Sequence, residues 1–381
     1  MDLIYADYAA TTPLDPRVLE AMLPYLTDTF YNAASSHAAG MQAQHAVMKS
    51  RMEIASHIGA KMNDIIFTSG ATEAINLAII GAARRALADG TRNRIVTMHT
   101  EHAAVRDAAE YCATLGIDVV WVPCDANGTV QLDAVRHAVT DRTIMLCVMA
   151  VNNETGVMQH LVELSAIAHS KGASFMTDAT QAYGKMPLDV DALGIDVMPF
   201  SAHKIYGPKG CGALYMRSSG NYACSVEPLL YGGGQERGLR SGTLNVPGIV
   251  GFATAGTIAY ANLSEESVRI ASLRDRFEQE VMNIPGTTVN GSGAMRSYNI
   301  SNVEFASDAD MMLVMMPNVA CSKGSACSSA KPKPSPVLTA MGRTAEQAGR
   351  SLRFSFGRMS SDADIDHLVS AIQEACSQRS Q

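Results

Sequence analysis

Apolar segments of five to eight residues alternate with amphipathic segments from about Ile65 onward. The apolar segments predict strands at 65–69, 94–98, 118–123, 144–151, 173–178, 196–201 and 212–217. The intervening segments predict helices at 71–90, 102–116, 133–139 and 161–172. Strands that alternate with helices favour a mostly parallel sheet covered on both faces. Because ligands in such folds bind at the carboxyl ends of the strands, the residues after each strand are the first candidates for chemistry.

The pattern changes after about Asn262. Helices are expected at 264–281 and 363–376, with strands at 287–291, 298–303 and 351–356. This mixture indicates a second, smaller α+β domain. We therefore predict a large domain at residues 13–257 and a small domain formed by residues 1–12 and 258–381. Residues 322–336, SKGSACSSAKPKPSP, have no hydrophobic period and predict a long exposed loop.

Length and composition fit a globular protein of two or three domains, at about 150 residues per domain. Of the 381 residues, 47% are hydrophobic and only 18% are charged, which favours an oligomer with buried subunit surface. The net charge of −7 argues against a surface that binds nucleic acid directly. The sequence has no apolar run of about 20 residues and no signal peptide, so we expect no membrane contact and a cytoplasmic location.

The eight cysteines are scattered, and none forms a C-x-x-C pair, which favours reduced thiols. The HTEH segment that ends at His102 is one residue short of a zinc-binding spacing, so no metal is predicted. Cys327 differs from the other cysteines because it lies in a Gly/Ser/Pro loop with three lysines close in sequence. An exposed thiol near cations has a lowered pKa and more thiolate, so we predict that Cys327 is reactive.

The residues that follow two of the predicted strands suit charged ligands. One position suits an anion, and the other suits a cation. Ala71 and Thr72 open a helix directly after a strand, and their position predicts either an anion site or an ordinary capped helix. Asp178 also follows a strand. A buried carboxylate there is either functional or the cap of the next helix.

A lysine and an arginine stand in unusual positions. Lys204 follows a strand that ends at Ser201, with His203 beside it and a glycine-rich turn after it. A desolvated lysine is the usual Schiff-base nucleophile, although a solvated lysine in a surface turn is the alternative. Arg353 lies within an apolar strand and needs a carboxylate partner. That partner is either a substrate or a protein Asp or Glu.

The order of the motifs resembles one family. ADYAATTPLDPRV, TSGATEAINL, TEHAAV, VNNETG, TDATQAYG, SAHKIYGPKG, RSGT, GSACSSA and LRFSFG follow one another from about Tyr5 to about His367. This set is similar to the cysteine desulfurases of the NifS/IscS type, and GSACSSA marks the first of their two groups. The resemblance implies pyridoxal 5'-phosphate as cofactor. It also implies the fold type I architecture of pyridoxal-phosphate-dependent transferases, which is that of class V aminotransferases and aspartate aminotransferase.

The resemblance also implies catalytic roles. Lys204 resembles the lysine that binds the cofactor covalently and then removes the α-proton of the substrate. Asp178 resembles the partner of the pyridine nitrogen, and His102 the imidazole on the ring face. Cys327 resembles the nucleophile that takes sulfur from L-cysteine as a persulfide, leaves L-alanine and passes the sulfur to a protein acceptor.

Further positions match the binding residues of the family. Gln181 and Asn153 match residues near the phenolic oxygen of the ring and the substrate carboxylate, and Arg353 matches the clamp on that carboxylate. Thr243 matches a threonine that reaches the phosphate of the neighbouring subunit, which implies a homodimer. The residues that match the phosphate cradle are Ala71, Thr72, Ser201 and His203.

The chain also departs from the family pattern. Tyr31 and Ala33 replace the usual glycine and proline of an active-site loop, and Cys321 stands where serine is more usual. A selenocysteine lyase, another enzyme of the same fold and a non-catalytic sulfur-transfer scaffold remain alternatives. The acceptor also stays open among iron–sulfur cluster assembly, tRNA thiolation and DNA phosphorothioation.

Overall fold

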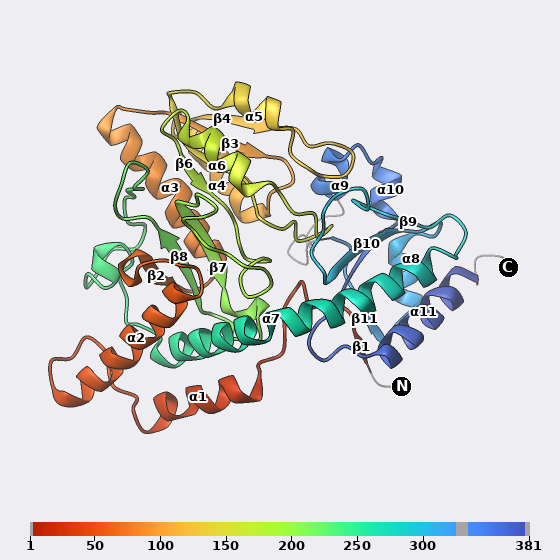
Figure 1. The fold of residues 1–381 in the computed structure, drawn as a ribbon, viewed down its shortest axis with the longest axis horizontal. Helices are drawn as coiled ribbons and strands as arrows, with labels where there is room; N and C mark the ends of the chain where they lie inside the picture. The colour runs from red at the N-terminus through yellow and green to blue at the C-terminus, as the bar shows by residue number, and fades with distance from the viewer. Residues whose placement is uncertain (1–2, 325–333, 378–381) are drawn as a thin grey trace.

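The computed structural model describes residues 3–324 and 334–377. Figure 1 shows a larger and a smaller lobe connected by the long helix α7 (Val246–Val281). The larger lobe contains a seven-stranded sheet and the smaller lobe a three-stranded sheet. Cys327 lies outside the described residues, together with most of the predicted 322–336 loop.

The seven-stranded sheet has the order β2-β8-β7-β6-β5-β3-β4. All pairs from β4 to β7 are parallel, and β8 is antiparallel to both neighbours. The predicted mostly parallel sheet is therefore confirmed, although the segment predicted as a strand to Val151 leaves the ladder after Cys147. The bounds are β2 Ile65–Thr68, β3 Arg94–Met98, β4 Asp118–Val122, β5 Thr143–Cys147, β6 Ser174–Met176, β7 Val197–Ser201 and β8 Gly212–Met216.

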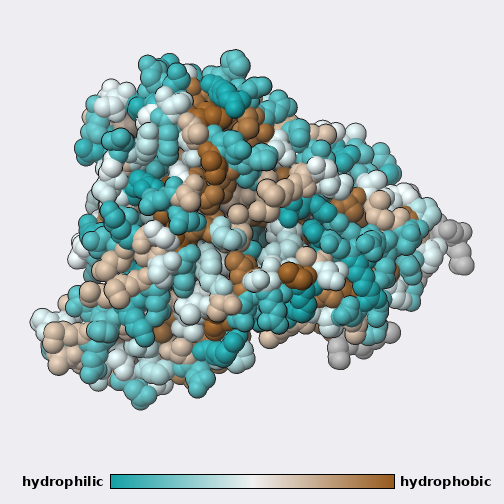
Figure 2. Space-filling model, in the orientation of Figure 1, coloured by the Kyte–Doolittle hydropathy of each residue, from teal (hydrophilic) through white to brown (hydrophobic). Residues whose placement is uncertain are grey.

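Helices cover both faces of this sheet, as predicted. One face packs against α3 (Ala71–Asp89) and α4 (Ala103–Thr114). The opposite face packs against α2 (Ala38–Ser56), α5 (Leu132–Ala138), α6 (Leu161–His169) and the first half of α7. α1 (Pro16–Thr27) packs outside α7. On the side shown in Figure 2, hydrophilic side chains predominate, and apolar ones gather in a stripe over the larger lobe.

The smaller lobe combines strands from both ends of the chain. Its antiparallel sheet has the order β12-β10-β9, and β1 from the N-terminus pairs in parallel with β11. These strands are β1 Ile4–Tyr5, β9 Thr288–Val289, β10 Ile300–Glu304, β11 Val319–Ala320 and β12 Ser351–Ser355. The helices are α8 Ala309–Met315, α9 Pro336–Ala340, α10 Ala345–Gly349 and α11 Asp362–Ser377. Three 3-10 turns complete the described elements: η1 Met62–Asp64, η2 Ala202–Lys204 and η3 Glu236–Gly238.

Helix α7 corrects one prediction from the sequence. It begins at Val246, so the helix predicted at 264–281 is only its second half. The first half packs in the larger core and the second half in the smaller core, and the predicted domain boundary at 257/258 lies inside the helix. α7 is also long and apolar enough to cross a membrane, but half of its most apolar window is buried in the protein. Alanine and glycine fill this first half, which weakens the hydrophobic period.

Candidate active site

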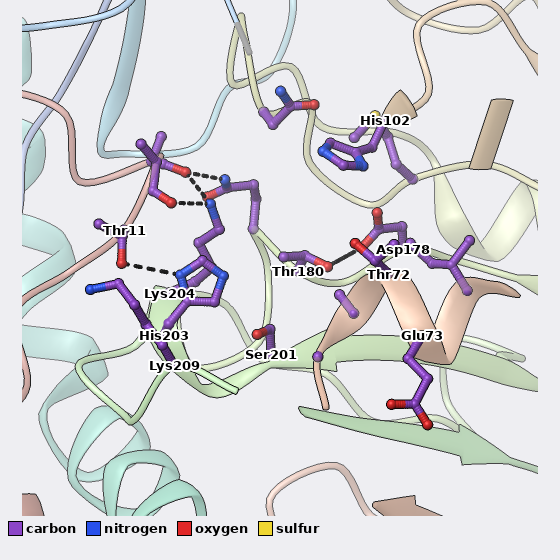
Figure 3. A pocket seen from close by; sticks show the side chains of 18 of the residues that line it. Thr11, Thr72, Glu73, His102, Asp178, Thr180, Ser201, His203, Lys204 and Lys209 are labelled. Atoms are coloured by element: carbon purple, nitrogen blue, oxygen red, sulfur yellow. Dashed lines mark hydrogen bonds between the residues drawn. The ribbon is translucent and has the colours of Figure 1, made fainter. Parts of the chain in front are cut away.

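A cavity of about 470 Å³ lies where β3, β5, β6 and β7 end. Its residues form two walls, which can be followed in Figure 3. The helix wall consists of Ala71, Thr72, His102 and Asp178. The N-terminal wall consists of Ala9, Ala10, Thr11, Gln181, His203, Lys204 and Arg353. Ser201 and Asn153 also line the cavity, so ten of the eleven described residues predicted for the site meet here, and the exception is Thr243.

The start of α3 in the helix wall offers free amide groups. Gly70 precedes the helix, and no side chain in the described part of the chain caps its first turn. Strand β8 approaches this point closely, because a Cβ on Gly212 would lie 2.6 Å from the Cα of Gly70. The uncapped N–H groups and the helix dipole favour an anion beside Ala71 and Thr72.

Asp178 is a buried carboxylate, only 4% exposed, that follows β6. Its Oδ1 accepts hydrogen bonds from the backbone N–H of Thr180 at 2.9 Å and from the Thr180 hydroxyl at 2.5 Å. Both bonds orient the carboxylate from within its own turn. A carboxylate held in this way can receive a proton-bearing nitrogen from a ligand.

His102 caps α4 from the same wall. Its Nδ1 accepts a hydrogen bond from the backbone N–H of Ala104 at 3.1 Å. Burial lowers the pKa of His102, and the nearby carboxylate of Asp178 offsets part of this effect. The ring is therefore neutral at neutral pH, and because Nδ1 acts as the acceptor, its proton lies on Nε2.

Lys204 occupies the opposite wall, on the turn η2 directly after β7. Its Nζ donates to the backbone carbonyls of Ala9 and Ala10 at 2.6 Å each. The neighbouring His203 contacts the Thr11 hydroxyl through Nδ1 at 3.1 Å. Burial, and to a smaller extent the charge of Lys204, lower the pKa of His203 to about 4. The N-terminal segment thus fixes both side chains.

Arg353 is 1% exposed, and its Nη2 forms an ion pair with Asp7 at 2.6 Å. Its Nη1 donates to the backbone carbonyl of Asn153 at 2.8 Å. The ion pair that the sequence left as an alternative is therefore present. Because Arg353 also lines the cavity, and its Nε has no partner in the described part of the chain, the guanidinium can still meet a carboxylate there.

The comparison with known proteins identifies the family. The family model described as aminotransferase class-V matches residues 4–368. The chain belongs to the class-V aminotransferase family. A cysteine desulfurase IscS from Rickettsia bellii (strain OSU 85-389) is 44% identical over 372 residues, which cover 97% of this chain and 90% of the relative. The resemblance predicted from the motifs is confirmed.

Two solved structures share the fold of this class-V aminotransferase. A NifS-like protein has a TM-score of 0.91 at 33% identity, covering 98% of this chain and 99% of its own. A structure described as SspA in complex with cysteine has a TM-score of 0.81 at 33% identity, covering 93% and 98%. The predicted fold type I architecture is therefore confirmed.

Pyridoxal phosphate is the cofactor of this class-V aminotransferase, as predicted, and the cavity fits it. The uncapped start of α3 suits a phosphate, the buried Asp178 suits a protonated ring nitrogen, and Lys204 lines the cavity from the opposite wall. The volume of about 470 Å³ is also in the range of small-molecule sites.

One predicted residue in the described part of the chain is not in the cavity. Thr243 is exposed and does not line it. Cys327 is outside the described residues, whereas Cys321 follows β11 directly. Burial raises the pKa of the Cys321 thiol to about 12, so this thiol is almost entirely protonated at neutral pH.

The sequence assigned no role to several residues of the site. The carbonyls of Ala9 and Ala10 hold Lys204, Thr180 orients Asp178, and Asp7 pairs with Arg353. The ADYAATT motif was a signal for Asp7 and the two alanines. However, backbone carbonyls have no residue-specific pattern, and their partners lie almost 200 residues away.

Proposed function

We propose that this class-V aminotransferase is a cysteine desulfurase that transfers the sulfur of L-cysteine to Cys327 and releases L-alanine. The predicted activity is supported by similarity to cysteine desulfurases over nearly the whole chain. The observation that carries the proposal is the cavity itself. It combines Lys204, Asp178 and His102 with an uncapped helix start.

The residues that would hold pyridoxal phosphate come from both walls. Ala71, Thr72, Ser201 and His203 would hold the phosphate, Asp178 the ring nitrogen and Gln181 the phenolic oxygen. Lys204 would bind the cofactor covalently. When bound, the cofactor supplies an electron sink for negative charge at the α-carbon of the substrate.

The side chains around the cavity position the substrate and its protons. Arg353 and Asn153 would bind the substrate carboxylate. The amine of Lys204, once released, would remove the proton from the α-carbon. The neutral His102 ring carries its proton on Nε2, and this group would assist proton transfer at the face of the cofactor ring.

The sulfur transfer requires a thiolate on Cys327. Its sulfur attacks the sulfur of the substrate, an S–S bond forms, and the C–S bond breaks. The bonding electron pair stays on the substrate carbon, which then takes a proton and becomes the methyl group of alanine. Cys321 does not suit this step because its thiol is half-buried and protonated.

A homodimer is also part of the proposal. The segment that carries Thr243 is attached to the larger lobe at two points: Glu236 pairs with the buried Arg51 at 2.5 Å, and Arg240 pairs with Glu73 at 2.7 Å. Glu73 lies in the first turn of α3 and lines the cavity. These ion pairs would present the exposed Thr243 to the phosphate site of a second subunit. Sedimentation of the active enzyme as a monomer would contradict this part.

The acceptor is proposed only as a class. A protein takes the sulfur for iron–sulfur cluster assembly, tRNA thiolation or DNA phosphorothioation, in the cytoplasm and without direct contact of this enzyme with nucleic acid. Affinity purification from native cells, with mass spectrometry of the bound proteins, would identify it.

The direct test is mass spectrometry of the enzyme after brief incubation with L-cysteine and no acceptor. One added sulfur is expected on the peptide that contains Cys327. The Cys327→Ser variant should bind cofactor and cysteine but release no alanine, because a serine hydroxyl is barely ionised. The Cys321→Ser variant is the matched control and should retain substantial activity. Sulfur only on Cys321, or full activity of Cys327→Ser, would contradict the proposal.

A further inference from the structure

Gln181 lines the cavity with a side-chain amide whose orientation is fixed by two partners. Its Nε2 donates to the backbone carbonyl of Ala9 at 2.8 Å, and its Oε1 accepts from Nζ of Lys185 at 3.1 Å. A carbonyl can only accept, and an ammonium can only donate. Both contacts therefore fix the same orientation of the Gln181 amide, with its nitrogen toward Ala9 and its oxygen toward Lys185.

Lys185 is not part of the cavity that holds Lys204 and Asp178. It lines a second cavity, of about 560 Å³, and Gln181 lines both cavities. In the described part of the chain no carboxylate lies within 4 Å of its Nζ, and Gln181 supplies the one hydrogen bond of this amine. Lys185 is half-buried, and a partly desolvated amine without an acid partner gains little for folding, so its contact with Gln181 calls for another reason.

We propose that Lys185 is a positioning residue that holds the Gln181 amide with an N–H directed at the phenolic oxygen of pyridoxal phosphate. The inference rests on the proposed function, in which the cavity holds this cofactor. One N–H of Gln181 is used by Ala9, which leaves the second N–H for the ligand. If the amide were reversed, its carbonyl would face an oxygen and repel it.

The same contacts connect Lys185 to the lysine of the site. The Ala9 carbonyl accepts from Gln181 and also from Nζ of Lys204. Lys185, Gln181, Ala9 and Lys204 therefore form a continuous series of hydrogen bonds from the second cavity into the first. Burial, and to a smaller extent the charges of Lys204 and Arg353, lower the pKa of Lys185 to about 7. Both protonation states of the amine carry N–H donors, so the contact to Oε1 survives either way.

A double-mutant cycle tests whether Lys185 acts through Gln181. Lys185→Met keeps an unbranched side chain that is one atom shorter and has no donor, and Gln181→Leu removes the amide. The measured quantities are the dissociation constant of pyridoxal phosphate from the apo-enzyme and the absorption maximum of the bound cofactor. Gln181→Leu is expected to weaken binding about tenfold, the value of one hydrogen bond to a charged group.

Lys185→Met is expected to weaken binding severalfold and to shift the absorption maximum in the same direction. The double variant should be no weaker than Gln181→Leu alone, because the lysine has no amide left to orient. Losses that multiply would mean that Lys185 acts independently and would overturn the proposal. Wild-type affinity and spectrum in Lys185→Met would overturn it as well.

Two further variants keep the test decisive. Lys185→Arg retains charge and donors beside the second cavity, and it should bind the cofactor within about twofold of the wild type. A folded Lys185→Arg enzyme with a tenfold loss would contradict the proposal even if Lys185→Met did not fold. Lys61→Met at an exposed position is the control for the substitution itself. A wild type that binds the cofactor but forms no alanine would refute the proposed function, and the cycle would still report on Lys185.

Discussion

The two walls of the cavity are built over very different distances along the chain. In the helix wall, Asp178 is oriented by Thr180 and His102 by Ala104, each only two residues away. In the N-terminal wall, Lys204 contacts a carbonyl 195 residues away, and Arg353 pairs with an acid 346 residues away. The helix wall therefore forms with its own turns, whereas the N-terminal wall requires that both lobes fold and meet.

The walls also differ in charge. In the helix wall, the carboxylate of Asp178 lies near the imidazole of His102. Burial lowers the pKa of His102 and the carboxylate raises it, so the two effects partly cancel. The N-terminal wall gathers Lys204, His203 and Arg353, with Lys185 behind them, and Asp7 is the carboxylate that pairs there. Substitutions in the helix wall should therefore affect chemistry more than stability, and substitutions in the N-terminal wall should affect both.

The largest effect is expected for Lys204→Ala. Without the amine there is neither a covalent anchor for the cofactor nor a base for the α-proton, so alanine formation should fall by about 10⁴-fold. Loss of cofactor on gel filtration should accompany this. Lys209→Ala, which removes another amine that lines the cavity, is the matched control and should lose far less. Alanine formation at the wild-type rate in Lys204→Ala would show that the anchor is elsewhere.

Asp178→Asn should be the most selective change in the helix wall. The amide keeps the size of the side chain and can still accept from Thr180, so the urea midpoint should change little. Because an amide does not favour a protonated ring nitrogen, turnover should fall by about 10²–10³-fold while the cofactor stays bound. Steady-state kinetics and the absorption spectrum measure both effects. Normal turnover with bound cofactor would remove Asp178 from the mechanism.

Asp7→Asn probes the N-terminal wall and should affect stability and binding together. It leaves the buried guanidinium of Arg353 without its ion pair, which should cost about 3 kcal/mol in the free energy of unfolding. The KM for cysteine should rise because Arg353 loses its position. Asp133→Asn, whose ion-pair carboxylate is 88% exposed, is the control and should cost less than about 1 kcal/mol. Equal urea midpoints for both variants would contradict the contrast between the walls.

The sequence predicts the helix wall better than the N-terminal wall for a physical reason. A strand followed by a helix start, or by Asp178, is a local pattern, and the rule that parallel strands end at one edge brings such groups together. For Lys204 and Arg353, the sequence pattern indicates the residue itself but not the group with which it forms a hydrogen bond or ion pair. The partners are Asp7 and two backbone carbonyls, and their positions depend on how the N-terminus folds across both lobes.

The fold was predictable to a similar degree. The alternation of strands and helices is strong wherever branched apolar residues form the sheet, and the seven strands lie within or beside the predicted segments. The first half of α7 was missed because alanine and glycine pack closely in the larger core without a clear apolar period. Thr243 and Cys327 were assigned through the family resemblance, and their roles remain predictions.

The smallest expected effect is a difference between the two walls in how their histidines change the stability of the protein as the pH falls. The pKa of His203 is lowered by burial and by the charges of Lys204, Lys209 and Lys185, to about 4. The pKa of His102 is lowered by burial as well, but Asp178 acts in the opposite direction. An unfolded histidine takes up a proton as the pH falls through about 6.5. Folded His203 stays neutral until about pH 4, so its share of the stability is complete above 6.5 and is lost as the pH falls toward 4.

Removing His203 should therefore remove more of this pH dependence than removing His102. The measurement is the urea midpoint of the apo-enzyme at about pH 7 and about pH 5, for the wild type, His203→Gln and His102→Gln. The wild type should lose the most stability on acidification, His102→Gln somewhat less, and His203→Gln the least. Carboxylates such as Asp15, whose pKa is lowered to about 2 mainly by a hydrogen bond from Arg17, titrate equally in all three proteins and cancel in the comparison. A steeper loss in His203→Gln than in the wild type would show that the cations of the N-terminal wall do not keep this ring neutral.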